Sequence, residues 1–257
     1  MNINELITDY SHVQNTSEDM FDKVIHITYK NIEKLENVKN QWLTLNPEYR
    51  IELYDDTRCI TFLNEYFGAK FGDIFNYIQD GPIKSDFFRI CVLYIYGGVY
   101  VDADIKPFIP LNEFIEDDIE LCTVISYNYQ KEKTVYNYNP HFIVAKKKNN
   151  YLYDTIKKYE LLYEQQSYSY WHWSICNLFN INDLEYNINN EKNAFTLNDK
   201  KYMFLIEKVV GPEDILYDFT NLFDENKQQK FKYSKYVFCD YDGKKVLENF
   251  TNKGNLL

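Results

Sequence analysis

The sequence predicts a single α/β domain with helices flanking a central sheet. Short β-rich apolar runs alternate with segments of helical spacing through the first half of the 257-residue chain. This alternation favours a mostly parallel, doubly wound sheet. The composition, with 45% hydrophobic and 18% aromatic residues, is sufficient for one sizeable core. Neither an internal repeat nor a linker requires a second domain.

The first four elements follow from hydrophobic spacing. Residues 23–29 form a short apolar run and predict a buried strand, and 35–45 carry apolar residues at helical spacing. A second strand is expected over 49–54. Asp56 or Thr57 is then placed to cap the next helix.

The stretch 81–104 is the most informative part of the chain. Gly81-Pro82 is suited to open a helix, which runs to about Tyr96, and Gly97-Gly98 is suited to end it. Residues 99–101 predict a short buried strand. Asp102 and Asp104 follow that strand directly.

The second half is predicted with fewer signals. The elements expected there are strands over 121–126, 141–145, 203–210 and 236–239, helices over 151–165 and 214–223, and an Asn-rich loop over 180–200. The proposed division of the chain is a lead-in over 1–22, one domain over 23–240 and a tail over 241–257. The first ten residues carry acids and no long apolar run, and no stretch of about 18 apolar residues follows. We therefore expect a cytoplasmic protein without a transmembrane segment.

The net charge and the cysteines argue against several classes of protein. The formal net charge of −11 argues against a nucleic-acid partner, and it means that a phosphate-bearing substrate needs local positive charge or a metal ion. The five cysteines are odd in number and form no CxxC pair, so neither a zinc site nor a disulfide framework is expected. A reducing compartment fits this usage.

Asp102 and Asp104 are the first candidates for chemistry. Open α/β sheets bind ligands at the carboxyl ends of their strands. Residues two apart on an extended chain point the same way, so both carboxylates can hold a hard divalent ion such as Mg or Mn. A solvated turn is the alternative interpretation. Asp240-Tyr-Asp242 has the same spacing without this context, and we expect no metal there.

Three polar residues in the preceding helix form a second group. Ser85, Asp86 and Arg89 lie three or four positions apart, so they can share one helix face. A buried charge in so apolar a helix needs a partner. The two interpretations are a mutual salt bridge between Asp86 and Arg89, or a role facing the donor sugar and its phosphates.

The segment 81–104 resembles the signature of the DXD-containing sugar transferases of glycosyltransferase family 32, read as S-D-x-x-R followed by G-G-x-Y-x-D-x-D. Three other stretches resemble this family. They are Val24–Tyr29, which resembles its first strand, Asn46–Asp56, which resembles its second, and Val210–Leu216, which resembles a Gly-Pro before a helix.

The resemblance implies a GT-A-like fold, a nucleoside-diphosphate sugar donor with UDP favoured, Mn or Mg, and transfer of a hexose with retention to a glycan or protein hydroxyl. It implies that Asp86 and Arg89 hold the donor sugar. Asp102 would lie on the ribose or sugar side, and Asp104 would be the direct metal ligand. The residues that the resemblance places with the donor are Tyr29, which would stack on the base, His26, Ser85, Tyr100 and Asp102. For Tyr100 a core aromatic, and for His26 a hydrogen-bonded core histidine, remain open.

The sequence departs from the family near its end. Relatives end in a His- or Asn-containing motif followed by Ser-Trp, whereas no His or Trp follows Trp173 here. Asp240, Asp242 or Asn252 are the candidates to replace the missing metal ligand. Trp171-His172-Trp173 is either an aromatic wall for the acceptor or a core or surface cluster.

Three other functions stay open. A haloacid-dehalogenase-type phosphatase also carries Asp-x-Asp after an apolar strand, but there a Thr or Val follows two residues on, where this chain has Lys106. A degenerate transferase would bind a nucleotide sugar or glycan without turnover. A protein-interaction scaffold would bind neither metal nor nucleotide.

Overall fold

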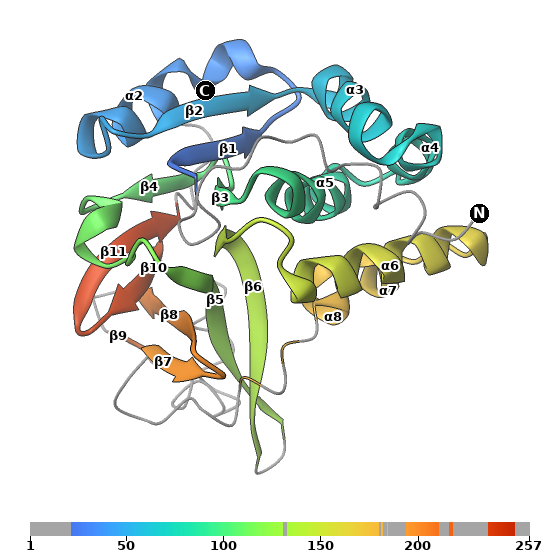
Figure 1. Ribbon diagram of the computed structural model, residues 1–257. Helices are drawn as coiled ribbons and strands as arrows, with labels where there is room; N and C mark the ends of the chain where they lie inside the picture. The colour runs from blue at the N-terminus through green and yellow to red at the C-terminus, as the bar shows by residue number, and fades with distance from the viewer. Residues whose placement is uncertain are drawn as a thin grey trace.

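The computed structural model describes residues 22–130, 133–179, 181, 184, 194–210, 216–217 and 236–249. A single curved sheet runs through these residues, with one helical layer on each face (Figure 1). The strands are β1 Val24–Thr28, β2 Arg50–Tyr54, β3 Gly98–Val101, β4 Ile105–Pro107, β5 Ile119–Gln130, β6 Lys133–Ala145, β7 Ala194–Leu197, β8 Lys200–Val210, β9 Leu216–Tyr217, β10 Tyr236–Tyr241 and β11 Lys244–Asn249.

The strands are arranged in the order β2-β1-β3-β6-β5-β8-β10-β11-β4, and β7 and β9 pair with β8. Parallel pairs join β1 to β2, β1 to β3 and β5 to β8, while the other described pairs are antiparallel. The α/β class is confirmed, but the expectation of a mostly parallel, doubly wound sheet is wrong. Parallel neighbours need a crossover connection, and beyond β4 the chain forms hairpins instead, such as β5–β6 and β10–β11.

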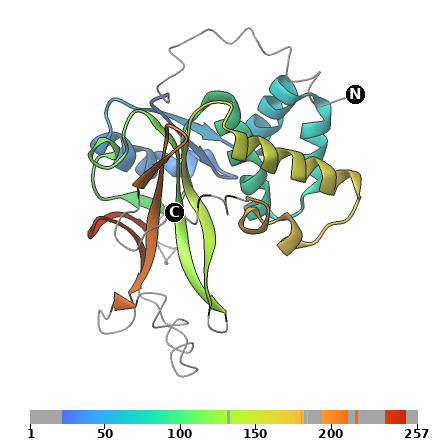
Figure 2. The ribbon, with the colours of Figure 1, turned by 60° about the horizontal axis from the view of Figure 1, so that its bottom comes forward.

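The helices and short 3-10 turns lie mostly in the first two thirds of the chain. They are η2 Ile32–Leu35, α2 Glu36–Leu45, α3 Asp56–Phe67, α4 Ala69–Tyr77, α5 Gly81–Tyr96, η3 Leu111–Glu113, α6 Asn150–Glu164, α7 Tyr170–Trp173 and α8 Ile175–Leu178. Figure 2 shows α3 to α6 gathered on one side of the sheet.

Several predicted elements need correction. The cap of α3 is neither Asp56 nor Thr57 but Asp55, whose carboxylate accepts from the backbone N–H of Arg58 at 2.8 Å. The predicted loop 180–200 contains β7, which pairs with β8. Within the predicted helix 214–223, residues 216–217 form β9, while Gly211-Pro212 and the rest of that helix lie outside the described residues.

The segment set apart as a tail also contains a strand. Residues Lys244–Asn249 form β11, which pairs with β10 on one side and with β4 on the other. Since β4 begins directly after Asp104, the end of β11 lies beside the predicted metal ligands, with Asn249 opposite Ile105.

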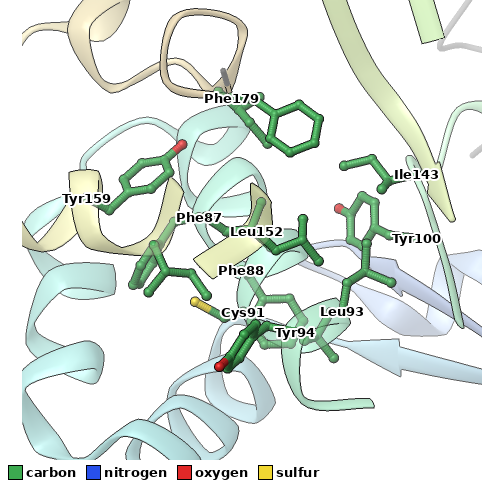
Figure 3. Packing of buried hydrophobic residues seen from close by; sticks show 14 of the residues in the cluster. Phe87, Phe88, Cys91, Leu93, Tyr94, Tyr100, Ile143, Leu152, Tyr159 and Phe179 are labelled. Carbon is green, nitrogen blue, oxygen red and sulfur yellow. The ribbon is translucent and has the colours of Figure 1, made fainter. Parts of the chain in front are cut away.

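Two hydrophobic clusters occupy the two faces of the sheet. The larger packs α3 to α6 and α8 against one face, and the smaller packs α2 and the 105–115 segment against the other. Figure 3 shows α5 in the larger cluster, where Phe87 lies near Tyr159 and Tyr100 lies near Ile143. Thus α5 is held between the sheet and α6. Within the described part of the chain, no helix is both long and apolar enough to cross a bilayer.

Candidate active site

The joint between α5 and β3 delivers the acidic pair to a fixed place. Gly97 ends α5 with φ of +65° while its N–H donates to the Leu93 carbonyl at 2.8 Å, and Gly98 follows with φ of +89°. A Cβ at Gly98 would lie 2.6 Å from the Val24 carbonyl oxygen, so only glycine lets β3 lie this close to β1. All four residues of β3 are buried. Asp102 therefore follows directly at the carboxyl end of a buried strand that lies between β1 and β6.

Arg89 ties this acidic pair to α5. Its guanidinium lies 3.1 Å from the Asp86 carboxylate and 2.9 Å from the Asp102 carboxylate. It also donates to the backbone carbonyls of Ser85, at 3.3 Å, and Pro140. The guanidinium is 4.7 Å from the centre of the Tyr100 ring. The salt bridge between Asp86 and Arg89, one of the two interpretations of this helix, is therefore present, and the same arginine also pairs with Asp102.

Burial controls the charges in this network. Although 30% of the Asp102 side chain is exposed, burial raises the pKa of its carboxyl to about 7, and Arg89 opposes that rise while Asp104 adds to it. Burial likewise raises the pKa of Asp86, against the effect of Arg89 and the Ile175 N–H. Burial alone would lower the pKa of Arg89, but Asp102 and its neighbours hold it above its ordinary value. A further cation next to Asp102 would favour its ionised form.

A cleft of about 590 Å³ opens in front of these residues. The cleft is lined by the end of β1 and its following loop, η2, the end of β2 with the start of α3, the end of α4 with the loop after it, the first turns of α5, and the segment that bears the acidic pair. Of the residues predicted for the site, the cleft is lined by Tyr29, Ser85, Arg89, Asp102 and Asp104. The sequence therefore placed five separate side chains at one cavity.

Two predicted site residues, Asp86 and Tyr100, lie behind the residues that line the cleft. Asp86 is 8% exposed, does not line the cleft, and forms its ion pair with Arg89. Tyr100 is fully buried, and its hydroxyl lies 2.6 Å from the Thr28 hydroxyl, which donates in turn to Ser85 at 3.1 Å. These residues support the lining groups rather than line the cleft.

His26 is also placed away from the cleft. It is fully buried, with Nε2 3.1 Å from the Gly97 carbonyl and Nδ1 3.1 Å from the Tyr54 hydroxyl. A carbonyl only accepts, so Nε2 carries the proton and Nδ1 accepts from Tyr54. Burial lowers the pKa of His26 to about 3. The structure thus gives His26 the role of a hydrogen-bonded core histidine that joins β1 to the end of α5.

Two cleft cations and one hydroxyl were missed by sequence reasoning. Lys30 and Lys84 line the cleft, as does Thr28. Lys84 lies within the motif stretch 81–104, and its position one residue before Ser85 was the signal available. These lysines add positive charge to the cleft lining, where Lys84 also pairs with Asp56 at 3.4 Å.

The chemistry of the acidic pair fits a hard divalent cation. Asp102 and Asp104 offer carboxylate oxygens at the cleft, and Mg²⁺ is commonly held by one or two protein carboxylates together with water and substrate phosphates. Among the described residues, no group of three or more His, Cys, Asp or Glu side chains converges on one point. Two carboxylates leave the other coordination positions of such an ion to water, substrate oxygens or further protein groups.

The second Asp-x-Asp belongs to a hairpin. Asp240 is 7% exposed, lies 3.3 Å from the Lys208 amine and accepts from the Gly243 N–H at 3.2 Å. Asp242 occupies the turn with φ of +50°. Both residues thus serve the β10–β11 turn, and Asn252 lies outside the described residues.

Residues 32–120 match the family of glycosyltransferase sugar-binding regions that contain a DXD motif. Within this match lie the first turns of α5, Arg89 and the acidic pair. This segment is thus similar to a DXD-type glycosyltransferase sugar-binding region. That region forms most of the cleft wall described above.

The chain is also similar to curated proteins that are named as glycosyltransferases. The chain is 26% identical over 161 residues to an uncharacterized glycosyltransferase of Acanthamoeba polyphaga mimivirus, covering 63% of this chain and 62% of that protein. It is 28% identical over 79 residues to the initiation-specific alpha-1,6-mannosyltransferase of Candida albicans, covering 30% and 20%. The chain thus spans less than two thirds of the length of these relatives.

Among solved structures, the PaToxG glycosyltransferase is similar at 19% identity and a TM-score of 0.42, with 72% of this chain and 74% of that chain covered.

Proposed function

We propose that this protein is a metal-dependent glycosyltransferase with a GT-A-like domain that begins at about residue 23 and, because β11 belongs to its sheet, extends beyond residue 240 to at least Asn249. It transfers a hexose from a nucleoside-diphosphate sugar, with UDP favoured, to a hydroxyl of a glycan or protein acceptor, with retention of configuration. The single observation that carries the proposal is the Arg89–Asp102 pair at 2.9 Å, which fixes the first acid of the DXD motif beside a cleft of about 590 Å³. The match of residues 32–120 to the sugar-binding region supports it.

Each residue has a role that follows from its position. Asp104, with Asp102, would hold Mg or Mn, and the bound ion would neutralise charge on the leaving nucleoside diphosphate. Lys30 and Lys84 add positive charge along the cleft. Tyr29 lies at the β1 end of the cleft, where its ring can stack on the base.

Arg89 acts by orientation. Since its guanidinium is already bound by two carboxylates and two carbonyls, it has little freedom to move. It holds the Asp102 carboxylate in place beside the cleft. Preorganised charge of this kind stabilises a transition state without reorganisation.

The test is metal-dependent hydrolysis of a donor sugar. With Mn present, release of the nucleoside diphosphate from UDP- and GDP-sugars is measured for the wild type, Asp104→Ala and Asp104→Asn. We expect a loss of about 100-fold or more in both variants, since removing one electrostatic stabiliser commonly costs that much. Asp242→Asn makes the same chemical change in the other Asp-x-Asp and should retain full activity.

The outcomes separate the candidate functions. Full activity of Asp104→Ala would refute the metal role. A thermal shift with a nucleotide sugar and Mn, without hydrolysis or transfer under any condition, would indicate a binding module instead. Release of phosphate from simple phosphoesters would indicate a phosphatase.

A further inference from the structure

Two large aromatic side chains stand exposed on the short helix α7. Trp171 is 69% exposed and Tyr170 is 41% exposed, whereas Trp173 is fully buried. Residues two apart on a helix point to nearly opposite sides. Trp173 packs its ring against Tyr77, Tyr159 and Tyr168, and its indole N–H donates to the Ser167 carbonyl at 2.8 Å. Anchoring Trp173 in the core therefore turns Trp171 outward.

The segment that carries these aromatics is joined to the cleft at two points. The Tyr168 hydroxyl donates to the Asp80 carboxylate at 2.6 Å, and Asp80 immediately precedes Gly81 and Pro82 in the cleft wall. Beyond α7, the Ile175 N–H donates to the Asp86 carboxylate at 3.2 Å, and that carboxylate also binds Arg89. The exposed pair thus lies on a segment fixed at both ends to the first turns of α5.

The pair is held in place before any ligand arrives. The rings of Tyr170 and Trp171 are 5.4 Å apart and nearly perpendicular, at 86°. The Tyr170 carbonyl accepts from the Ser174 N–H at 2.9 Å, and the Trp171 carbonyl accepts from the Asn177 side-chain amide. When a ligand packs on these rings, the protein would therefore lose little further conformational entropy.

We propose that Tyr170 and Trp171 form an acceptor platform that stacks on a hexopyranose ring of the acceptor glycan. This inference rests on the proposed function and names the acceptor side of the same site. The electron-rich face of an aromatic ring attracts the C–H groups on the apolar face of a sugar. The two exposed rings lie on a segment that is hydrogen-bonded to α5, the helix that bears Asp86 and Arg89.

Polar groups around the platform favour a sugar over an apolar protein surface. His172 is exposed between the two tryptophans. The hydroxyl of the exposed Tyr170 can both donate and accept a hydrogen bond. Alternating rings and hydrogen-bonding groups match a ligand with apolar faces and hydroxylated edges.

Tryptophan fluorescence tests the platform without any need for turnover. The chain has three tryptophans, and Trp42 and Trp173 are fully buried, so quenching by acrylamide reports chiefly on Trp171. Maltotriose, α-1,6-mannotriose, methyl α-glucoside and methyl α-mannoside are titrated into the full chain. We expect saturable protection of the emission from acrylamide by at least one of these sugars. Absence of protection with all four, or the same protection in Trp171→Phe, would overturn the proposal.

Transfer kinetics provide the second arm. Trp171→Ala and Tyr170→Ala should each raise the KM for the acceptor by about tenfold, the loss expected when one aromatic contact is removed. Leu161→Ala, which removes a 54% exposed side chain from α6, is the matched control and should leave that KM unchanged. A variant that lost donor hydrolysis and transfer in equal measure would contradict an acceptor role. If the wild type hydrolyses no donor, the proposed function fails, while the fluorescence arm still decides the platform.

Discussion

Arg89 combines a structural and a chemical role in one side chain. Its guanidinium is 4% exposed and lies between Asp86 and Asp102, so three charges share one buried site. Breaking a buried ion pair by removing one partner is costly because the remaining charge loses its compensation. Loss of activity in an Arg89 variant therefore needs to be measured together with stability.

We expect Arg89→Ala to lower the free energy of unfolding by about 3–5 kcal/mol, since it leaves two carboxylates without their cation. Urea denaturation at pH 7 measures this change. Arg58→Ala is the control, because Arg58 is 49% exposed and its exposed pair with Glu52 should contribute no more than about 1 kcal/mol. Equal losses in the two variants would refute the burial argument.

The lowered pKa of His26 leads to a second prediction, which concerns the pH dependence of stability. Its pKa falls to about 3 in the folded protein, below the ordinary value of 6.5. The unfolded chain therefore binds a proton first as the pH falls, and stability is lost below pH 6.5. Each pH unit of difference corresponds to about 1.4 kcal/mol, so His26 should cost about 2 kcal/mol of stability between pH 7 and pH 5.

The measurement compares unfolding of the wild type and His26→Gln over that pH range. Glutamine can still donate to the Gly97 carbonyl but does not titrate. The variant should lose about 2 kcal/mol less stability than the wild type on acidification. Parallel pH profiles would show that His26 is not held neutral.

The joint between α5 and β3 is the element that places the site. A helix that ends in two glycines of positive φ passes at once into a buried strand, and the acidic pair follows. Gly98 is restricted twice, since its φ is +89° and a Cβ would contact the Val24 carbonyl. Glycine is thus required at Gly98 because β3 lies so close to β1.

We expect Gly98→Ala to destabilise the protein by several kcal/mol more than Gly243→Ala. Gly243 also has positive φ, at +74°, but nothing lies within 4 Å of its Cβ position, so it reports the backbone cost alone, about 1–2 kcal/mol. Thermal and urea denaturation of both variants gives the comparison. Similar losses would show that the contact with Val24 relaxes without cost.

At the scale of the whole molecule, the last described strand joins β4 to the rest of the sheet. β11 fills the gap between β10 and β4, and it buries Val246 and Leu247 in the smaller cluster. β4 follows Asp104 directly, so this late strand braces the segment beyond the acidic pair. We infer that the folded domain extends at least to Asn249.

Leu247→Ala should lower the free energy of unfolding by about 2–5 kcal/mol, as expected for a fully buried leucine. Lys244→Ala, at an exposed position of the same strand, should change it by no more than about 0.5 kcal/mol. Chemical denaturation of the two variants is the measurement. A neutral Leu247→Ala would place the domain boundary before β11.

Local signals predicted the first half of the fold well. The strand β3, the helix α5 and its glycine end were expected within a residue or two, because the helix and strand periods and the glycines are local properties. The later hairpins were less predictable, since antiparallel partners such as β10 and β11 are chosen by long-range pairing. β7 in the Asn-rich stretch and β9 in place of a helix show the same limit.

The sequence by itself identified the side chains to which we assign the proposed chemistry. Asp86, Arg89, Asp102 and Asp104 stand in one ordered motif. Spacing predicts a shared helix face for the first two and a shared direction for the last two, and the family resemblance implies that both pairs face the donor. Only the tertiary structure decided which of them reach the cleft. Burial and the hydrogen-bond partners offered by distant strands turn Asp102 outward while they hold His26 and Tyr100 inside. Such contacts join residues some 70 positions apart, and a local pattern does not encode them.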